Sequence, residues 1–406
     1  MNLVDDAAQM QGDLEQLRQR LHATPEVGLI LPRTQEIVLE QLDGLGLELT
    51  TGTRTTSVTG VLRGGRRDPE NPATVLLRGD MDGLPVAEDT GLDFASTNGA
   101  MHACGHDFHT TSLVGAAQLL SRHRDNLAGD VVFMFQPGEE GFDGAGVMID
   151  EGVLEASGRR PDAAYALHVI STMTASGVFT SRPGTMMSAS HKLVVTVRGA
   201  GGHGSMPFRA KDPILAAAQM IAALETMITR TFDIFDPVVL SVGSIHGGTK
   251  ANVIPETVTF EATVRRFSRE SEELLERAIT QTLRGVAHAN GVDVDHELIA
   301  EYPVTINDEW ETAFGADVVR EALGEERFLT AKNPIAGSED FSRVLEEIPG
   351  VFMNIGATLP GLDPASAPLN HSPQADFDPS VLQDGVAVYA TLAERRLDLL
   401  AAGGAR

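Results

Sequence analysis

The sequence of 406 residues contains one cysteine, one tryptophan and only 31 basic residues against 57 acidic ones. The lone Cys104 excludes a disulfide bond within the chain, and a free thiol fits a reducing compartment. A formal charge of −26 argues against a nucleic-acid partner, because contact with the phosphate backbone requires a basic surface. The charge does not exclude a small anionic substrate, since a local arginine or metal ion can outweigh distant acidic groups.

No stretch of the sequence approaches the roughly 18 apolar residues of a membrane-spanning helix. The N-terminal segment MNLVDDAAQMQGDLEQL is acidic and lacks the basic flank and apolar core of a secretion signal. We therefore expect a cytoplasmic protein with no membrane partner. The chain is longer than one ordinary compact domain, so we expect two domains.

Short apolar runs that end in polar or glycine-rich residues recur along the chain. ATVLLRGD, GDVVFMFQ, AAYALHV and GVFMNIGA are of this kind and are typical of buried strands. Segments of helical periodicity lie between them, and this alternation predicts an α/β domain with a mostly parallel sheet. Binding sites in such sheets lie beyond the carboxyl ends of the strands.

The middle of the chain has a different pattern. The alternating segments HKLVVTVRG, PVVLSVGSIHGG and TVTFEATVRRF are interleaved with two long amphipathic helical segments. This pattern predicts a small α+β domain over residues 190–297. The domain is inserted into a larger one that we expect to be catalytic and to consist of residues 1–189 and 298–406.

Residues that commonly bind metals gather near the predicted strand ends. The stretch MHACGHDFHT, residues 101–110, combines the only cysteine with three histidines, and further candidates lie in QPGEE, YALH and LNHSP. The candidates are Cys104, His106, Glu139, Glu140, His168 and His371. Such a set suits zinc, with manganese, cobalt or nickel as the other options. Five protein ligands exceed the three of an open catalytic zinc site, so we expect two divalent ions.

A family resemblance becomes visible when the motifs are taken in order. RGDMDGLP, MHACGHDFHT, QPGEEG, ALHV, GGHGSMP, NVIP, TVRRF, GSEDF and NHSP resemble those of metal-dependent amidohydrolases of the aminoacylase and carboxypeptidase clan. The similarity spans nearly the whole chain and is closest to the branch of hippurate hydrolases, N-acyl-amino-acid amidohydrolases and indole-acetyl-amino-acid hydrolases. It implies a zinc-peptidase-like catalytic domain with two divalent ions and an inserted lid domain that forms a homodimer.

The resemblance also implies an activity, which is hydrolysis of the amide bond of small N-acyl amino acids to a carboxylic acid and a free amino acid. A carboxypeptidase or dipeptidase-type peptide hydrolase is the alternative. Asp80 stands where dipeptidase-like branches carry a ligand histidine, and His106 supplies the imidazole instead. The hippurate hydrolase branch has the same arrangement.

Carried over motif by motif, the resemblance assigns roles to individual residues. The implied metal ligands are Cys104, His106, Glu140, His168 and His371. Glu139 is the implied general base, because one of two adjacent carboxylates can bind metal while the other accepts a proton from water. His203 is implied to polarise the scissile carbonyl, and Asn252 and Arg265 to bind the substrate carboxylate.

Two other classes of protein compete with the hydrolase. GAGGHG, residues 199–204, matches the G-x-G-x-x-G fingerprint of nicotinamide-dependent dehydrogenases, and Glu225 follows at about the required 20 residues. That fingerprint begins its helix inside the motif, whereas Pro207 and Pro213 delay the next predicted helix to Asp212. A metal-binding scaffold without activity is disfavoured because Glu139 is intact beside the ligands. The sequence therefore favours the hydrolase.

Overall fold

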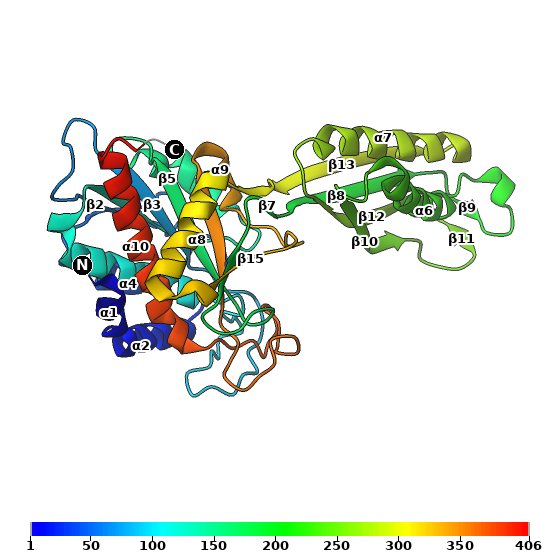
Figure 1. Ribbon diagram of the computed structural model, residues 1–406. Helices are drawn as coiled ribbons and strands as arrows, with labels where there is room; N and C mark the ends of the chain where they lie inside the picture. Colours follow the sequence, from blue (N-terminus) through cyan, green and yellow to red (C-terminus); the bar gives the residue numbers. More distant parts are fainter. Residues whose placement is uncertain (1, 405–406) are drawn as a thin grey trace. The chain divides into compact units, whose positions relative to one another are not determined.

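The computed structural model describes residues 2–404 and divides into two compact units. The first unit comprises the chain up to Met186, Ile306–Asn333 and the residues from Asp340 onward. The second unit comprises Met187–Thr305 and Pro334–Glu339. Each unit encloses its own hydrophobic core, and Figure 1 traces the chain through both from blue to red.

One sheet forms the centre of the first unit. Its strands are β1 (Glu48–Thr51), β2 (Val58–Leu62), β3 (Ala73–Asp80), β4 (Gly129–Gln136), β5 (Ala163–Ile170), β6 (Phe179–Ser181), β15 (Phe328–Thr330) and β16 (Gly350–Gly356), in the order β1-β2-β4-β3-β5-β16-β6-β15. The central strands β4, β3, β5 and β16 are parallel, whereas β1 and β2 add an antiparallel edge. The predicted α/β class with a mostly parallel sheet is confirmed.

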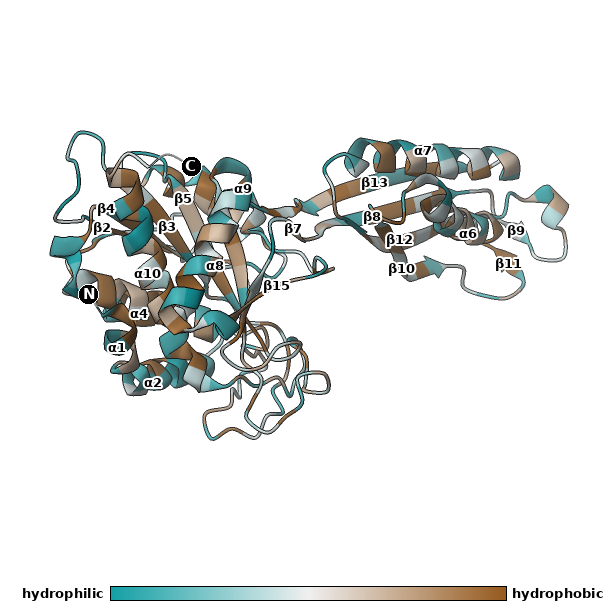
Figure 2. Cartoon of the chain, viewed as in Figure 1, coloured by the Kyte–Doolittle hydropathy of each residue, from teal (hydrophilic) through white to brown (hydrophobic). Residues whose placement is uncertain are grey.

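Helices enclose this sheet. They are α1 (Leu3–Ala8), α2 (Gln11–His22), α3 (Pro32–Leu42), α4 (His106–Arg122), α5 (Gly144–Asp150), α8 (Glu309–Leu323), α9 (Ser342–Glu347) and α10 (Leu382–Ala401). Strands β3, β4 and β5 are buried along almost their whole length, and α10 packs against both α4 and β3. Parallel strands covered on both faces consist of continuous apolar runs, which are brown in Figure 2.

The second unit is a smaller α+β layer structure. It contains β8 (Ala189–Arg198), β10 (Val238–Gly247), β12 (Thr257–Arg266), β13 (Asp293–Tyr302), α6 (Pro213–Thr231) and α7 (Ser271–Asn290). The strands form an antiparallel sheet in the order β10-β12-β8-β13, and their alternating buried side chains share one core with α6 and α7. Asp212 caps α6 by accepting the backbone N–H of Ile214 at 2.9 Å.

Two short ribbons complete the strands. One pairs β9 (Gly202–His203) with β11 (Val253–Ile254), and the other pairs β7 (Gly184–Met187) with β14 (Thr305–Asn307). Residue 297, the predicted end of the inserted domain, lies inside β13, and the second compact unit continues to Thr305. Within residues 2–404, the longest and most apolar helices still fall short of what crossing a membrane requires.

The predicted site residues of the first unit lie where its parallel strands end. β3 ends at Asp80, Glu139 and Glu140 follow β4, and His168 lies near the C-terminal end of β5. Because parallel strands end at the same edge of a sheet, the chain places these side chains together.

Candidate active site

The turn that begins α4 presents two predicted ligands from adjacent positions. Gly105 has φ = 88° and separates Cys104 from His106, the first residue of the helix. A Cβ atom at position 105 would lie 2.3 Å from Val169 Cγ2, so the position has no room for a side chain. Glycine therefore allows Cys104 and His106 to approach the end of β5 together.

The five predicted metal ligands converge in the first unit. The Cys104 Sγ atom lies 3.4 Å from His168 Nε2 and 3.2 Å from His371 Nε2. Glu140 Oε1 lies 3.2 Å from His371 Nε2 and 3.9 Å from His106 Nε2. One thiol, one carboxylate and three imidazoles thus face a common centre, and four of these side chains are largely buried.

The tautomer of His168 suits a ligand. Its Nδ1–H donates to the backbone carbonyl of Val169 at 2.8 Å, which leaves the lone pair of Nε2 directed toward Cys104. Burial lowers the pKa of His168 well below its usual range, so the ring is neutral. Metal-binding histidines commonly donate their second ring N–H to such a carbonyl.

His106 provides a second test of whether a metal fits. Its ring is 1% exposed, and within residues 2–404 neither ring nitrogen has a hydrogen-bond partner. The nearest carboxylate oxygens of Asp80 and Asp82 lie 3.6 and 3.4 Å away. Buried polar atoms are normally paired. A buried imidazole that has no hydrogen bonds and lies among carboxylates therefore suits a divalent cation.

His371 lies on the solvent side of the cluster, with a positive φ of 71° and a side chain that is 54% exposed. Hydrogen bonds to Cys104 and then to Glu140 raise the pKa of His371 to about 10. A metal ion that binds here must therefore displace a proton from the imidazole.

Glu139 lies beside the ligand set. It is 7% exposed, and an oxygen of its carboxylate lies within 4.8 Å of both the Glu140 carboxylate and a ring nitrogen of His106. The buried Asp82 holds the backbone of this pair, since Oδ1 accepts from the N–H of Glu139 at 3.0 Å and Oδ2 from that of Glu140 at 3.2 Å. Asp82 was not identified from the sequence, although it stands in the same RGDMDGLP motif as Asp80.

The other histidines of the stretch at residues 101–110 differ from His106. His109 uses both ring nitrogens within the protein, because Nδ1 lies 2.5 Å from Asp80 Oδ1 and Nε2 accepts the backbone N–H of Val169 at 2.7 Å. His102 is buried and, within residues 2–404, its ring nitrogens have no hydrogen-bond partner, yet it belongs to none of the potential metal-binding groups.

The remaining predicted site residues lie in the second unit. His203 is exposed in β9, where its Nδ1 accepts the backbone N–H of Ser205 at 3.1 Å. Asn252 is its neighbour across the ribbon, since the Asn252 carbonyl accepts the N–H of Gly204 at 2.9 Å. Arg265 in β12 is half-buried and donates from Nη1 to Ser338 Oγ at 2.8 Å.

The structure also shows why the dinucleotide fingerprint does not apply. Residues 199–204 run into the short strand β9 and a single 3₁₀ turn at Pro207–Arg209, and α6 begins only at Pro213. A dinucleotide site needs the backbone amides of a helix start inside the motif. The motif here forms a ribbon instead.

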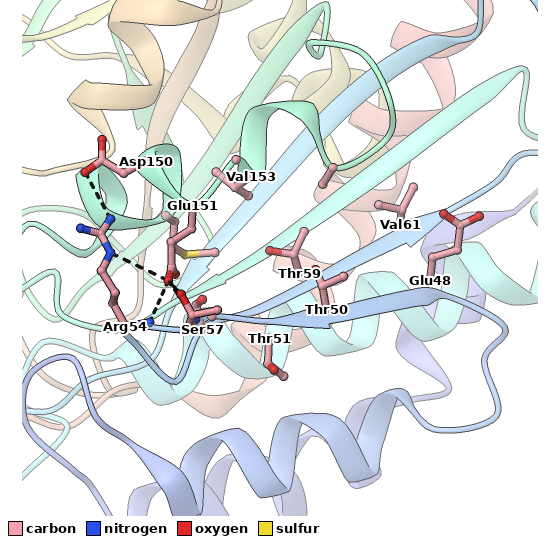
Figure 3. A pocket seen from close by; sticks show the side chains of 15 residues that line it. Glu48, Thr50, Thr51, Arg54, Ser57, Thr59, Val61, Asp150, Glu151 and Val153 are labelled. Carbon is pink, nitrogen blue, oxygen red and sulfur yellow. Dashed lines mark hydrogen bonds and ion pairs between the residues drawn. The ribbon is translucent and has the colours of Figure 1, made fainter.

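A hollow of about 640 Å³ elsewhere in the first unit contains none of the predicted site residues. It lies between the β1–β2 hairpin and the segment after α5, and hydroxyl and carboxylate side chains dominate its lining (Figure 3). There Glu151 Oε1 accepts the backbone N–H groups of Thr53 and Arg54, both at 2.8 Å, so this carboxylate orders a surface turn.

Comparison with known proteins points to the same chemistry. The sequence pattern of peptidase family M20/M25/M40 matches residues 76–395. An IAA-amino acid hydrolase of Arabidopsis thaliana is 36% identical over 386 residues, 94% of this chain and 85% of the relative. A hippurate hydrolase of Campylobacter jejuni is 36% identical over 342 residues, 84% of this chain and 87% of the relative.

Among solved structures, a dinuclear metal-binding peptidase of the M20 family from Bacillus subtilis superposes with a TM-score of 0.82. It is 28% identical in sequence, and the alignment covers 96% of this chain and 99% of the other.

Proposed function

Because the chain belongs to peptidase family M20/M25/M40, whose members are metal-dependent hydrolases, we propose that it hydrolyses the amide bond of N-acyl amino acids. The convergence of Cys104, His106, Glu140, His168 and His371 beside the buried Glu139 is the observation that carries this proposal. Two relatives are named as hydrolases of IAA-amino acids and of hippurate, and these names support N-acyl amino acids as the substrate class.

Each of these residues has a part in the proposed reaction. Two divalent ions held by the five ligands, zinc first among the options, would polarise the scissile carbonyl and acidify the attacking water. Glu139 accepts the proton of that water and donates it to the departing amine. Asp82 accepts the backbone N–H groups of Glu139 and Glu140, and so holds the main chain that carries the proposed proton carrier next to the proposed ligand Glu140.

His203 suits the role of a hydrogen-bond donor to the substrate. Since its Nδ1 accepts from the Ser205 N–H, a neutral ring carries its proton on Nε2. That N–H stabilises the negative charge that develops on the carbonyl oxygen during attack by water.

Arg265 and Asn252 bind the carboxylate of the substrate in this proposal. A planar guanidinium matches a carboxylate through two parallel hydrogen bonds. Ser338, whose hydroxyl already accepts from Arg265 Nη1, holds the arginine in one orientation. The sequence did not identify Ser338, because 73 positions separate it from Arg265.

The second unit supports a homodimer as the state of the protein. Its exposed large apolar side chains are Met206, Phe208, Ile214, Leu215, Ile234, Phe235, Val239, Ile245, Val253 and Ile299. Large exposed apolar side chains gathered on one unit suit an interaction surface, and β10 is an outer strand of the sheet, to which a further strand can pair. A second copy of the chain is the proposed occupant. A cytoplasmic location stays a prediction that rests on the sequence.

The proposed function is tested with the metal-loaded protein and a panel of amino acids carrying acetyl, benzoyl or indole-acetyl groups. We expect hydrolysis of at least one member, faster than that of dipeptides with a free C-terminus. Faster cleavage of dipeptides would favour the carboxypeptidase or dipeptidase alternative. Full metal occupancy without turnover of any compound would favour a scaffold protein.

Replacing the carboxylate-binding arginine should affect substrates selectively. Arg265→Lys is expected to raise KM for N-acyl amino acids by about tenfold or more, since a charge-assisted hydrogen bond contributes about 1.5–3 kcal/mol and an ammonium cannot form the bidentate pair. KM for the corresponding acyl amino acid amides should change little. Arg198→Lys, on an exposed arginine paired with Asp295 in the same unit, is the matched control. Equal losses on both kinds of substrate would make Arg265 structural.

The single thiol gives a direct readout of metal binding. Cys104→Ala should lower the metal content, and a thiol reagent should modify wild-type protein only after the metal has been removed, because a coordinated thiolate is shielded. Since the chain has one cysteine, the labelled mass reports this site alone. Unfolded protein provides the control for complete labelling. If the metal-loaded and metal-free forms react at the same rate, Cys104 is a packing residue.

A further inference from the structure

His109 connects a buried ion pair to the chain segment that carries a metal ligand. On one side, its Nδ1 lies 2.5 Å from Asp80 Oδ1, and Asp80 Oδ2 accepts from Arg78 Nη1 at 2.6 Å. On the other side, His109 Nε2 accepts the backbone N–H of Val169 at 2.7 Å. All three side chains are at most 2% exposed, so water does not compete for these bonds.

The hydrogen bonds define the tautomer of His109. A backbone N–H can only donate, so Nε2 must carry the lone pair and Nδ1 the proton. The proton on Nδ1 then points to the carboxylate of Asp80, which accepts it. Asp80 thus selects the one neutral form of the ring that can accept from Val169.

Val169 is the residue that orients the ligand His168. Its carbonyl accepts the Nδ1–H of His168 at 2.8 Å and the Nδ2–H of Asn370 at 3.0 Å. Asn370 directly precedes the ligand His371 and also donates to the Cys104 carbonyl at 3.1 Å. A displacement of Val169 would therefore be transmitted to His168, His371 and Cys104 through three hydrogen bonds.

We propose that His109 is a positioning residue for the metal centre, and that Asp80 acts through it by holding the tautomer that anchors Val169 and, with Val169, His168. The inference rests on the proposed role of His168 as a ligand. It gives Asp80 a function other than metal binding, although Asp80 stands where the dipeptidase-like branches carry a metal-binding histidine. His109 does not touch the substrate or the reacting atoms.

Two substitutions of His109 separate its two nitrogen positions. Asparagine can place an amide near the position of Nδ1, so His109→Asn retains a donor for Asp80 but does not reach Val169. Glutamine can place its oxygen near the position of Nε2, so His109→Gln retains the acceptor for the Val169 N–H. If the anchor matters, the asparagine variant should be the more damaging of the two.

The readout is zinc affinity, measured by competition with a chelator, together with the absorption spectrum of the cobalt-substituted protein. Loss of a hydrogen bond that orients a ligand typically costs 10- to 100-fold in affinity, and we expect a loss of about that size for His109→Asn with a shifted cobalt spectrum. His109→Gln should stay within about threefold of the wild type. Wild-type affinity in the asparagine variant, or equal losses in both variants, would overturn the proposal.

Tyr389→Phe is the matched control. The Tyr389 hydroxyl accepts the backbone N–H of Leu167 at 2.8 Å, which is another buried bond to β5, one residue before His168. Zinc affinity in this variant should change by less than about twofold, because the anchor at Val169 remains. A loss as large as that of His109→Asn would show that any weakened bond to β5 has the same effect, and would overturn the proposal.

Two further measurements check the ligand role of His168 and the tautomer of His109. His168→Ala should abolish zinc binding at the position that His168 is proposed to serve. If zinc still binds there, the proposed ligand role of His168 is wrong, and that failure is distinct from a failure of the inference about His109. Should His109→Asn not fold, ¹⁵N-histidine NMR of the wild type reports the tautomer directly. A proton on Nδ1 of His109 supports the proposal, and a proton on Nε2 contradicts it.

Discussion

Glu139→Gln should lower kcat by about 10²- to 10⁴-fold and leave the metal content at the wild-type level. The amide of glutamine occupies almost the same volume as the carboxylate but cannot accept the proton of the attacking water. The ligand set is unchanged, because the backbone of residue 139 remains held by Asp82 and the five predicted ligands are all other residues. Steady-state kinetics and metal analysis on the same preparation measure both effects.

The neighbouring carboxylate provides the control. Glu140→Gln makes the same chemical change one residue later and should reduce metal content, since Glu140 Oε1 lies among the ligands at 3.2 Å from His371 Nε2. The two variants should thus separate proton transfer from metal binding. Activity of Glu139→Gln within tenfold of the wild type at full metal content would remove Glu139 from the role of general base.

A mixture of two inactive variants should regain roughly a quarter of the wild-type activity if His203 serves the metal centre of a partner subunit. The variants are Glu139→Gln and His203→Ala, combined in equal amounts under conditions that allow subunits to exchange. Half of the randomly formed dimers are mixed, and each mixed dimer has one of its two sites with both residues intact. The physical basis is the exposed position of His203 in β9, within the unit whose apolar surface we propose as the dimer contact.

Each variant alone, taken through the same exchange procedure, is the control for recovered activity that does not depend on mixing. Mass spectrometry or two different tags must show that mixed dimers have formed. Mixed dimers without recovered activity would mean that His203 acts within its own chain or has no catalytic role, since every site would then keep one lesion.

The strands that could be predicted are those whose residues are apolar along the whole strand because both faces are buried. The runs in β3, β4 and β5 are apolar along their length because helices cover both faces of the sheet, and such runs are visible without a structure. The antiparallel edge formed by β1 was not predicted, because ELTT is four exposed residues with no hydrophobic pattern. The end of the second unit was also hard to locate, since β13 alternates evenly across residue 297.

The candidate ligands could be found from the sequence because Cys104 is the only cysteine, and because Glu140 and His168 stand at the ends of predicted strands. The residues that hold them could not, because their roles depend on pairs that are distant in the chain. His109 is 29 positions from Asp80 and 60 from Val169. In the sequence alone, a histidine at this position could equally be a metal ligand or a residue that holds a ligand in place. Only the hydrogen bonds of the folded chain show that both its nitrogens are already used.

The glycine between Cys104 and His106 restricts which residues this turn can accept. Cys104 and His106 reach the shared centre through their side chains, whereas Gly105 contributes only main chain to the turn. At Gly105 the positive φ and the methyl group of Val169, 2.3 Å from any Cβ atom, exclude the other amino acids. We therefore expect a substitution at Gly105 to disturb both predicted ligand positions at once, whereas a substitution at Cys104 or His106 changes a single donor.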